Sequence, residues 1–299
     1  MDRIKYITKK IAGVFKRYIG YAILISVFVV VYLSLNVASY SLYEKYIKVA
    51  DTVGSEYSNE PSSDESYENA DCNVAGVNLH GQLTTYIPQK EPLDLSDVVP
   101  ADYISYYIKK AIKNPDIKAI VLEVDSGGGS PVAGEEIAHL LKTSSKPTVA
   151  VIRQMGTSAA YWASTGANII FASKNSDIGS IGVTFSYLDN VGKNAKEGLN
   201  YVELFSGKYK ESGNPDRTLT DEEKNLIMRD LKIIHSNFIK AVAQNRNLSV
   251  EKVSSLADGS SVLGEQAKKL GLIDRIGDLV DVEDYLSEKI GEKVEICWN

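Results

Sequence analysis

Ser158 has the neighbours expected of a serine nucleophile. It follows a short turn that contains Gly156 and begins a run of small residues, Ser158-Ala159-Ala160. A serine between a strand and a helix can present its hydroxyl in a cleft, close to the unpaired backbone N–H groups of the helix start. The same position also suits an ordinary helix N-cap, so the serine alone does not decide between the two roles.

A serine attacks at neutral pH only with a base beside it. The three histidines, His80, His139 and His235, lie in strand or helical patterns away from turns of small residues, and are interpreted as polar or surface residues. A Ser–His–Asp triad is therefore not indicated. H-E-x-x-H spacing is absent and the two cysteines lie far apart, so no metal site is expected. Lysine can be the base if its pKa falls from about 10.4 toward 7–8, but composition does not single out one lysine.

Gly127-Gly128-Gly129 follows a predicted buried strand, Ala119–Val124. Such a run can supply oxyanion N–H donors, cradle a phosphate, or form a plain turn. It matches neither G-x-G-x-x-G nor a Walker loop. All three readings stay open on this pattern alone.

The elements around these residues alternate between helical and strand patterns, which indicates an α/β fold with much parallel pairing. Val74–Tyr86 reads as one long strand or a strand pair. Thr220-x-x-Glu223 resembles a capping box and opens an amphipathic helix to about Asn245. The other predicted strands are Thr148–Ile152 and Ile169–Ala172, and the other predicted helices are Asp102–Lys113, Ala133–Lys142 and Ala159–Ser164.

The N-terminus predicts a membrane anchor. Residues 1–17 carry six basic side chains against one acid, and Tyr18–Tyr40 is uncharged. At 1.5 Å per residue, this run can cross a core of roughly 30 Å as a transmembrane helix. A signal peptide cleaved near Asn36-Val37-Ala38 is the alternative. The basic flank places the N-terminus in the cytoplasm and the remaining chain outside. The net charge of −6 gives no sign of nucleic-acid binding.

Residues 41–71 are expected to be an acidic flexible stalk, because Asp51–Cys72 holds seven acids and no lysine or arginine. Residues 72–299 contain no Pro/Gly/Ser-rich linker and no repeat. Their length allows one large domain or two small ones, and the absence of a linker predicts one domain.

Five segments, in this order, resemble the signal peptide peptidase A (SppA) family of membrane-bound serine peptidases. They are DSGGGSP (Asp125–Pro131), MGTSAAYWAST (Met155–Thr165), DIGSIGV (Asp177–Val183), SGKYKESGNP (Ser206–Pro215) and ADGSSVLGEQAKKLGLIDRIG (Ala257–Gly277). In this family the lysine is the last residue of an S-G-x-x-K pattern. Ser206–Lys210 matches the pattern, so the resemblance selects Lys210 rather than Lys208. The resemblance thus implies a catalytic dyad of Ser158 and Lys210.

Further roles also come from this resemblance. Ser180 is similar to a serine that hydrogen-bonds the family's lysine, and would orient Lys210. Gly128 and Gly129 match the family's oxyanion loop, with the N–H of Ala159 as a further donor. Gly127 stands where many relatives have proline, and this departure from the family pattern loosens the loop.

The resemblance implies a Clp peptidase/crotonase-like fold of repeated β-β-α units and a homo-oligomeric ring, in which Lys210 of one protomer can serve Ser158 of its neighbour. The expected activity is a membrane-anchored serine endopeptidase, without cofactor, acting on signal-peptide remnants or other membrane-proximal peptides. The alternatives are an inactive scaffold of the same fold and a crotonase-like acyl-CoA enzyme.

Cys72 and Cys297 lie at the two ends of the predicted domain, in an oxidising compartment if the topology is as expected. Domain ends often lie close together, which favours a disulfide. Two separate thiols are the alternative, because the sequence does not show the required approach of the Cα atoms.

Overall fold

The computed structural model describes residues 32, 72–87 and 97–299. The predicted basic tail, the stalk and all of the predicted membrane segment except Tyr32 lie outside these residues. Within the described ranges, no helix combines the length and apolar character needed to cross a bilayer. From Cys72 onward the described residues belong to one compact unit of mixed α/β structure.

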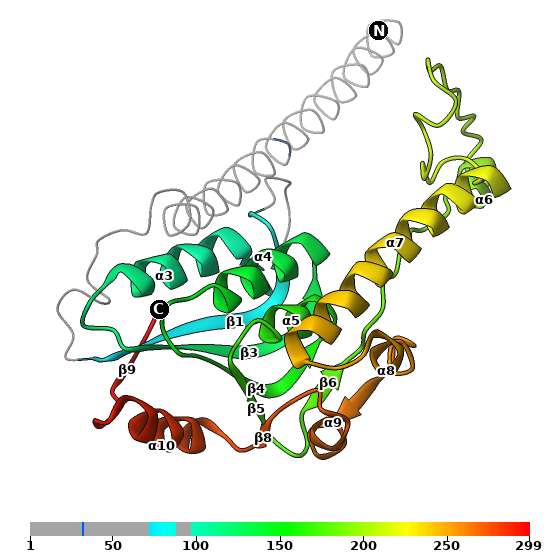
Figure 1. Ribbon diagram of the computed structural model, residues 1–299. Helices are drawn as coiled ribbons and strands as arrows, with labels where there is room; N and C mark the ends of the chain where they lie inside the picture. The colour runs from blue at the N-terminus through cyan, green and yellow to red at the C-terminus, as the bar shows by residue number, and fades with distance from the viewer. Residues whose placement is uncertain (1–31, 33–71, 88–96) are drawn as a thin grey trace, which may run out of the picture. The chain divides into compact units, whose positions relative to one another are not determined.

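Three long parallel strands form the centre of this unit: β1 (Val74–Thr84), β3 (Ala119–Gly129) and β4 (Thr148–Thr157). The main strand order is β2-β1-β3-β4-β5-β8 (Figure 1). Along this order every pair is parallel. The shorter strands are β2 (Val98–Pro100), β5 (Ile169–Ala172), β6 (Asp177–Gly179), β7 (Ser261–Leu263), β8 (Arg275–Ile276) and β9 (Ile296–Trp298).

The apolar run of β3 is buried on both faces, as expected of a central parallel strand. Ile120 and Leu122 join the core beneath α3 (Ala101–Lys113), α4 (Pro131–Lys142) and α5 (Ser158–Ser164). Val121 faces the opposite core, which α10 (Leu279–Ile290) closes with Val282 and Leu286. The helices therefore lie on both faces of the sheet (Figure 1).

The longest described helix, α7 (Asp221–Arg246), starts at the predicted capping box. Thr220 and Glu223 exchange side-chain-to-backbone hydrogen bonds there, and the helix ends at Asn247 in a left-handed conformation. Near its C-terminal end, Phe238 stacks on Trp162 of α5, with ring centroids 4.8 Å apart. The remaining helices are α6 (Val191–Lys196), α8 (Val250–Ser254) and α9 (Gly264–Leu270).

In the structure the predicted strand Ala119–Val124 continues to Gly129. Its pairing with β1 shifts register between His80 and Gln82 and then goes on. Gln82 pairs with Gly128 and Leu83 with Gly129, so the glycine run is the end of a strand rather than a free loop. Val74–Tyr86 is one strand to Thr84, which decides between the two readings of that segment.

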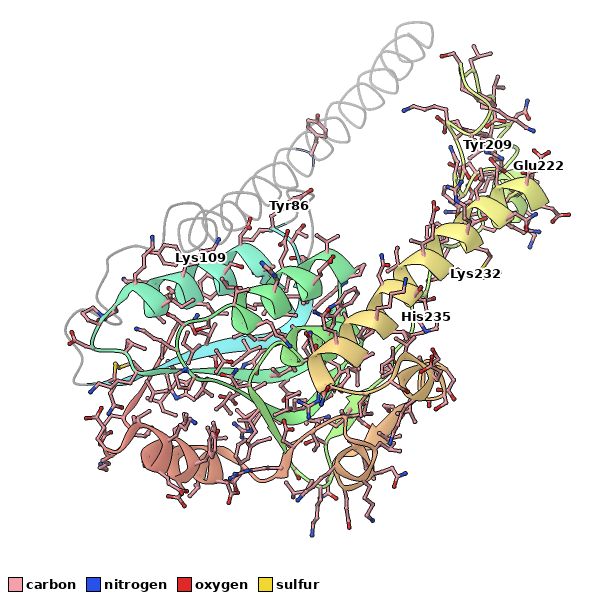
Figure 2. All side chains as sticks on the ribbon, in the orientation of Figure 1. Tyr86, Lys109, Tyr209, Glu222, Lys232 and His235 are labelled. Atoms are coloured by element: carbon pink, nitrogen blue, oxygen red, sulfur yellow. A yellow bond between two sulfur atoms is a disulfide. The ribbon has the colours of Figure 1, made fainter. Side chains whose placement is uncertain are left out.

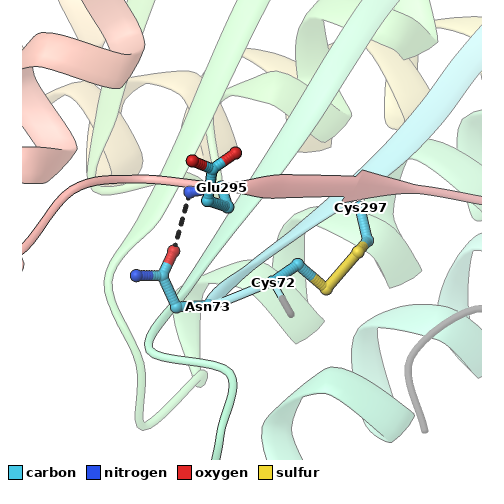
Figure 3. Close-up of a disulfide and its surroundings, with 4 residues drawn as sticks. All are labelled: Cys72, Asn73, Glu295 and Cys297. Atoms are coloured by element: carbon cyan, nitrogen blue, oxygen red, sulfur yellow. Dashed lines mark hydrogen bonds between the residues drawn. A yellow bond between two sulfur atoms is a disulfide. The ribbon is translucent and has the colours of Figure 1, made fainter. Parts of the chain in front are cut away.

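Cys72 and Cys297 form a disulfide, with Cα atoms 5.8 Å apart (Figure 3). The pairing follows from the sheet, since β9 lies parallel to β1 with Ala75 opposite Cys297. Beside the bond, the Glu295 N–H donates to the Asn73 side chain at 2.9 Å (Figure 3). The two ends of the domain are thus joined at one edge of the sheet.

We expect replacement of both cysteines by serine to lower the free energy of unfolding. The chain-entropy estimate for closing so long a loop is roughly 4–5 kcal/mol, as an upper bound. Urea unfolding of the two proteins, with and without reductant, measures the loss. Reductant should destabilise the parent and leave the double-serine variant unchanged. Equal stability of the two proteins would contradict the assignment.

Candidate active site

Ser158 lies where β4 ends and α5 begins, in a left-handed conformation with φ of 52°. This conformation is uncommon for residues other than glycine, and such strain is found most often at functional sites. The preceding Thr157 is extended, so the chain turns sharply at the serine. The turn leaves Ser158 half-buried beside the first backbone N–H groups of α5.

Tyr161 and Trp162, which follow Ser158-Ala159-Ala160, hold α5 in position. Tyr161 is fully buried and its hydroxyl donates to the carbonyl of Leu272 at 2.8 Å. Burial raises the pKa of Tyr161 well above its ordinary value, so the phenol keeps its proton and its hydrogen bond. Trp162 packs on Phe238 of α7. Both contacts hold the helix that begins with Ser158.

Gly128 approaches Ser158 more closely than any residue with a side chain could. A Cβ on Gly128 would lie 2.7 Å from Ser158 Cβ and 2.9 Å from the backbone N of Ala159, and its φ is 102°. The Gly128 N–H donates to the Oγ of Ser126 at 3.1 Å. Since this N–H is already engaged within the protein, the observed role of Gly128 is to allow close approach.

Gly129, by contrast, lines a cavity of about 490 Å³ beside Ser158. Ala159 lines it as well, so two of the three predicted oxyanion residues border this space. The cavity combines apolar walls with a few polar side chains. Its lining residues are Gly129, Pro131, Ser158, Ala159, Trp162, Ser180, Gly182, Val183, Thr184, His235, Phe238, Ala257, Asp258 and Gly259.

Ser180 reaches the same cavity from the end of β6. Like Ser158 it is left-handed, with φ of 49°. Its Oγ donates to the carbonyl of Gly259 at 2.9 Å, and its N–H donates to the carbonyl of Ser260 at 3.0 Å. One hydroxyl oxygen, with lone pairs left to accept a hydrogen bond, is therefore held in place near Ser158.

Lys210 does not line this cavity. It belongs to residues 183–220, called the arm below, which extends to the far end of α7. Next to it, the Tyr209 hydroxyl lies 3.4 Å from Glu222 Oε2. Glu222 precedes Phe238 by 16 residues of helix, about 24 Å at 1.5 Å per residue. Figure 2 shows Tyr209 and Glu222 at the end of α7 opposite the sheet. Within one chain the structure separates Lys210 from Ser158.

Where the arm joins the start of α7, an ion pair between Arg217 and Glu223 holds it in place. Arg217 donates to Glu223 Oε2 at 3.0 Å and to the carbonyl of Glu211 at 2.8 Å. The Arg217 guanidinium lowers the pKa of Glu223 to about 2. A carboxyl group whose pKa is lower in the folded chain than in the unfolded chain stabilises the fold at every pH above its unfolded-state pKa. This stabilisation is lost as the pH falls from there toward 2. The arm therefore keeps its ion pair across the physiological range.

His235, which the sequence analysis set aside, lines the cavity together with Ser158. Its position three residues before Phe238 places both on one face of α7, a relation visible in the sequence. Nothing in the sequence linked that face to the serine turn. Among the described residues, no group of three His, Cys, Asp or Glu side chains is arranged to hold a metal ion.

Comparison with known proteins identifies the family. The profile of Peptidase family S49 matches residues 140–293, about half of the chain. The chain belongs to this family. It is 36% identical over 178 residues to a putative protease of Methanocaldococcus jannaschii, an alignment that covers 59% of this chain and 57% of that protein.

A putative signal peptide peptidase SppA of Enterococcus faecium is 32% identical over 185 residues, covering 61% of this chain and 54% of that protein. The chain thus spans a little over half the length of these relatives. The SppA-family resemblance inferred from the five sequence segments is confirmed. Among solved structures, a ClpP1 variant of Listeria monocytogenes has a TM-score of 0.42 and 17% identity, covering 68% of this chain and 91% of that one.

The contact between Gly128 and Ser158 predicts a sharp difference between neighbouring glycines. Gly128→Ala should lower kcat/KM for peptide hydrolysis by at least about 100-fold, because the new methyl group displaces Ser158 and the backbone N–H of Ala159 beside it. Gly127→Ala is the matched control, since its Cβ would lie 3.7 Å from Met155 Sδ, an ordinary contact. Equal activity of the two variants would refute the spacing role.

Proposed function

We propose that this S49-family chain is a serine endopeptidase in which Ser158 is the nucleophile and Lys210 the general base. The observation that carries the proposal is the left-handed Ser158 at the edge of a cavity that Gly129, Ala159 and Ser180 also line. The lysine comes from the family's S-G-x-x-K pattern, which the chain matches at Ser206–Lys210.

The chemistry is acyl transfer to water. Neutral Lys210 takes the proton from Ser158 Oγ as the oxygen attacks the peptide carbonyl, and the N–H groups of Gly129 and Ala159 stabilise the oxyanion. One such donor lowers the barrier by about 2.7–4 kcal/mol. Lys210 then protonates the leaving amine, and water repeats the sequence to release the acyl group. Ser180 accepts a hydrogen bond from the lysine and orients it.

The separation of Lys210 from Ser158 supports a dyad formed across two protomers. The arm exposes apolar side chains that a monomer would leave in water: Leu188, Leu199, Val202 and Leu204. Leu204 is 96% exposed. An arm of this kind gains stability by packing on a neighbouring copy, and in a ring each copy would give its lysine to the next cavity.

Lys208 and Lys210 differ in their surroundings, which supports the choice between them. Lys208 forms an ion pair with Glu222 at 2.5 Å, and this contact raises its pKa. A lysine with a raised pKa is a poor base at neutral pH. Within the described chain, Lys210 has no such ion pair, so its amine is free to act elsewhere.

Ser158→Ala and Lys210→Ala should each lower kcat by at least about 1,000-fold, because the nucleophile and base act as a unit. Lys208→Ala is the control and should retain most activity. Activity of the parent should rise with pH as the base loses its proton. Near-normal turnover by Lys210→Ala would show that the base is misassigned. A fluorophosphonate probe should label the parent and not Ser158→Ala, and absence of labelling would favour an inactive scaffold.

Mixing the two inactive variants tests the assembly. If the dyad crosses an interface, random mixing leaves about a quarter of the sites with both residues, so a comparable share of activity returns. The subunits must first be shown to exchange, for example by energy transfer between labelled copies. Exchange without any recovery of activity would favour a dyad within one chain.

We further propose that Tyr18–Tyr40 anchors the chain with its peptidase domain outside the cytoplasm, which makes membrane-proximal peptides the substrate class. This rests on the basic flank and the uncharged run in the sequence. Protease added outside intact cells or spheroplasts should cut near residues 55–66. Protection of that region until the membrane is lysed would reverse the topology.

A further inference from the structure

His235 shares the cavity with Ser158 but has no part in the proposed mechanism. Its Nε2 is buried and has no hydrogen-bond partner among the described residues. The side chain projects from α7 between the sheet and the far end of the helix, where Tyr209 and Glu222 lie (Figure 2). A buried nitrogen without a partner is unfavourable, so such an atom in a substrate cavity points to a ligand group that completes it.

Two other polar side chains of the cavity have hydrogen-bond partners. The Asp258 carboxylate accepts from the Ser260 N–H at 2.9 Å and from its hydroxyl at 2.6 Å, and these hydrogen bonds lower the pKa of Asp258. The Ser180 hydroxyl donates to Gly259. Among the described cavity residues, His235 is the one whose buried polar side-chain atom lacks a partner.

The cavity wall beside His235 is aromatic. Trp162 and Phe238 lie nearly parallel, with an interplanar angle of 7°, and both line the cavity. Val183 and Ala257 add small apolar surfaces. The two rings stack on each other and are only 4% and 2% exposed, so their edges border the cavity, and His235 supplies a hydrogen-bonding group beside them. The volume of about 490 Å³ leaves ample room for one aromatic side chain.

We propose that His235 is a specificity residue that hydrogen-bonds the phenol of a substrate tyrosine whose ring enters the cavity beside the edges of Trp162 and Phe238. The inference rests on the proposed peptidase function and names the side chain that the cavity selects. A phenol both donates and accepts, so it pairs with either neutral tautomer of His235.

The test compares peptides that differ only by one hydroxyl, with tyrosine or phenylalanine placed at each position in turn. At one position the parent chain should prefer tyrosine by about tenfold in kcat/KM, because phenylalanine leaves the imidazole unpaired. His235→Phe keeps an aromatic ring of similar size and should bring this ratio near one. His235→Gln should keep part of the preference.

His139→Phe is the matched control, since His139 is exposed on α4, and it should leave the ratio unchanged. A parent chain that cleaves peptides without preferring tyrosine, or a preference that survives in His235→Phe, would overturn the inference. So would a preference for lysine over norleucine at the same position. If His235→Phe fails to fold, as judged by circular dichroism, His235→Leu replaces it.

Binding separates this inference from the proposed function. The full chain carrying Ser158→Ala is titrated with the same labelled peptide pair, and fluorescence anisotropy gives the two Kd values. Tighter binding of the tyrosine peptide, lost with His235→Phe, supports the role of His235 even if the parent cleaves nothing. Equal binding of the two peptides overturns it while leaving the dyad untouched.

Discussion

The close approach of the Gly128 backbone to Ser158 is the constraint on which the rest of the site depends. It exists because β3 and β4 are parallel neighbours whose C-terminal ends meet, with Ser126 opposite Gly156. A left-handed glycine on one strand and a left-handed serine on the other then share a space that admits no additional carbon. Ser158 and the backbone N–H of Ala159 are therefore positioned by the sheet itself, not by a mobile loop.

Lys210, the proposed base, lies in a less firmly packed part of the molecule than Ser158. It belongs to the arm, whose side chains are mostly exposed, at the end of a helix whose first half is also largely exposed. A rigid Ser158 and a distant Lys210 suit the proposed dyad between protomers, because an isolated chain would then lack a complete site.

Much of this organisation could be predicted from local patterns. The capping box at Thr220, the buried strand beginning at Ala119 and the serine at a strand–helix junction depend on neighbours in the sequence, and the structure has all three. The cavity could not be predicted in this way. His235 reaches it only because α7 crosses α5 through the Phe238–Trp162 contact, a tertiary relation without a local signature. The family pattern, not periodicity, selected Lys210, and a pattern does not reveal how far apart two residues lie.

The bond between Cys72 and Cys297 makes the peptidase domain a covalent ring closed at the sheet edge. The exposed arm lies within this ring, so a single proteolytic cut there would release no fragment. A nicked protomer would keep both pieces, held by β1 and β9 as well as by the disulfide. Its damage would remain invisible on a non-reducing gel and appear as two bands only after reduction.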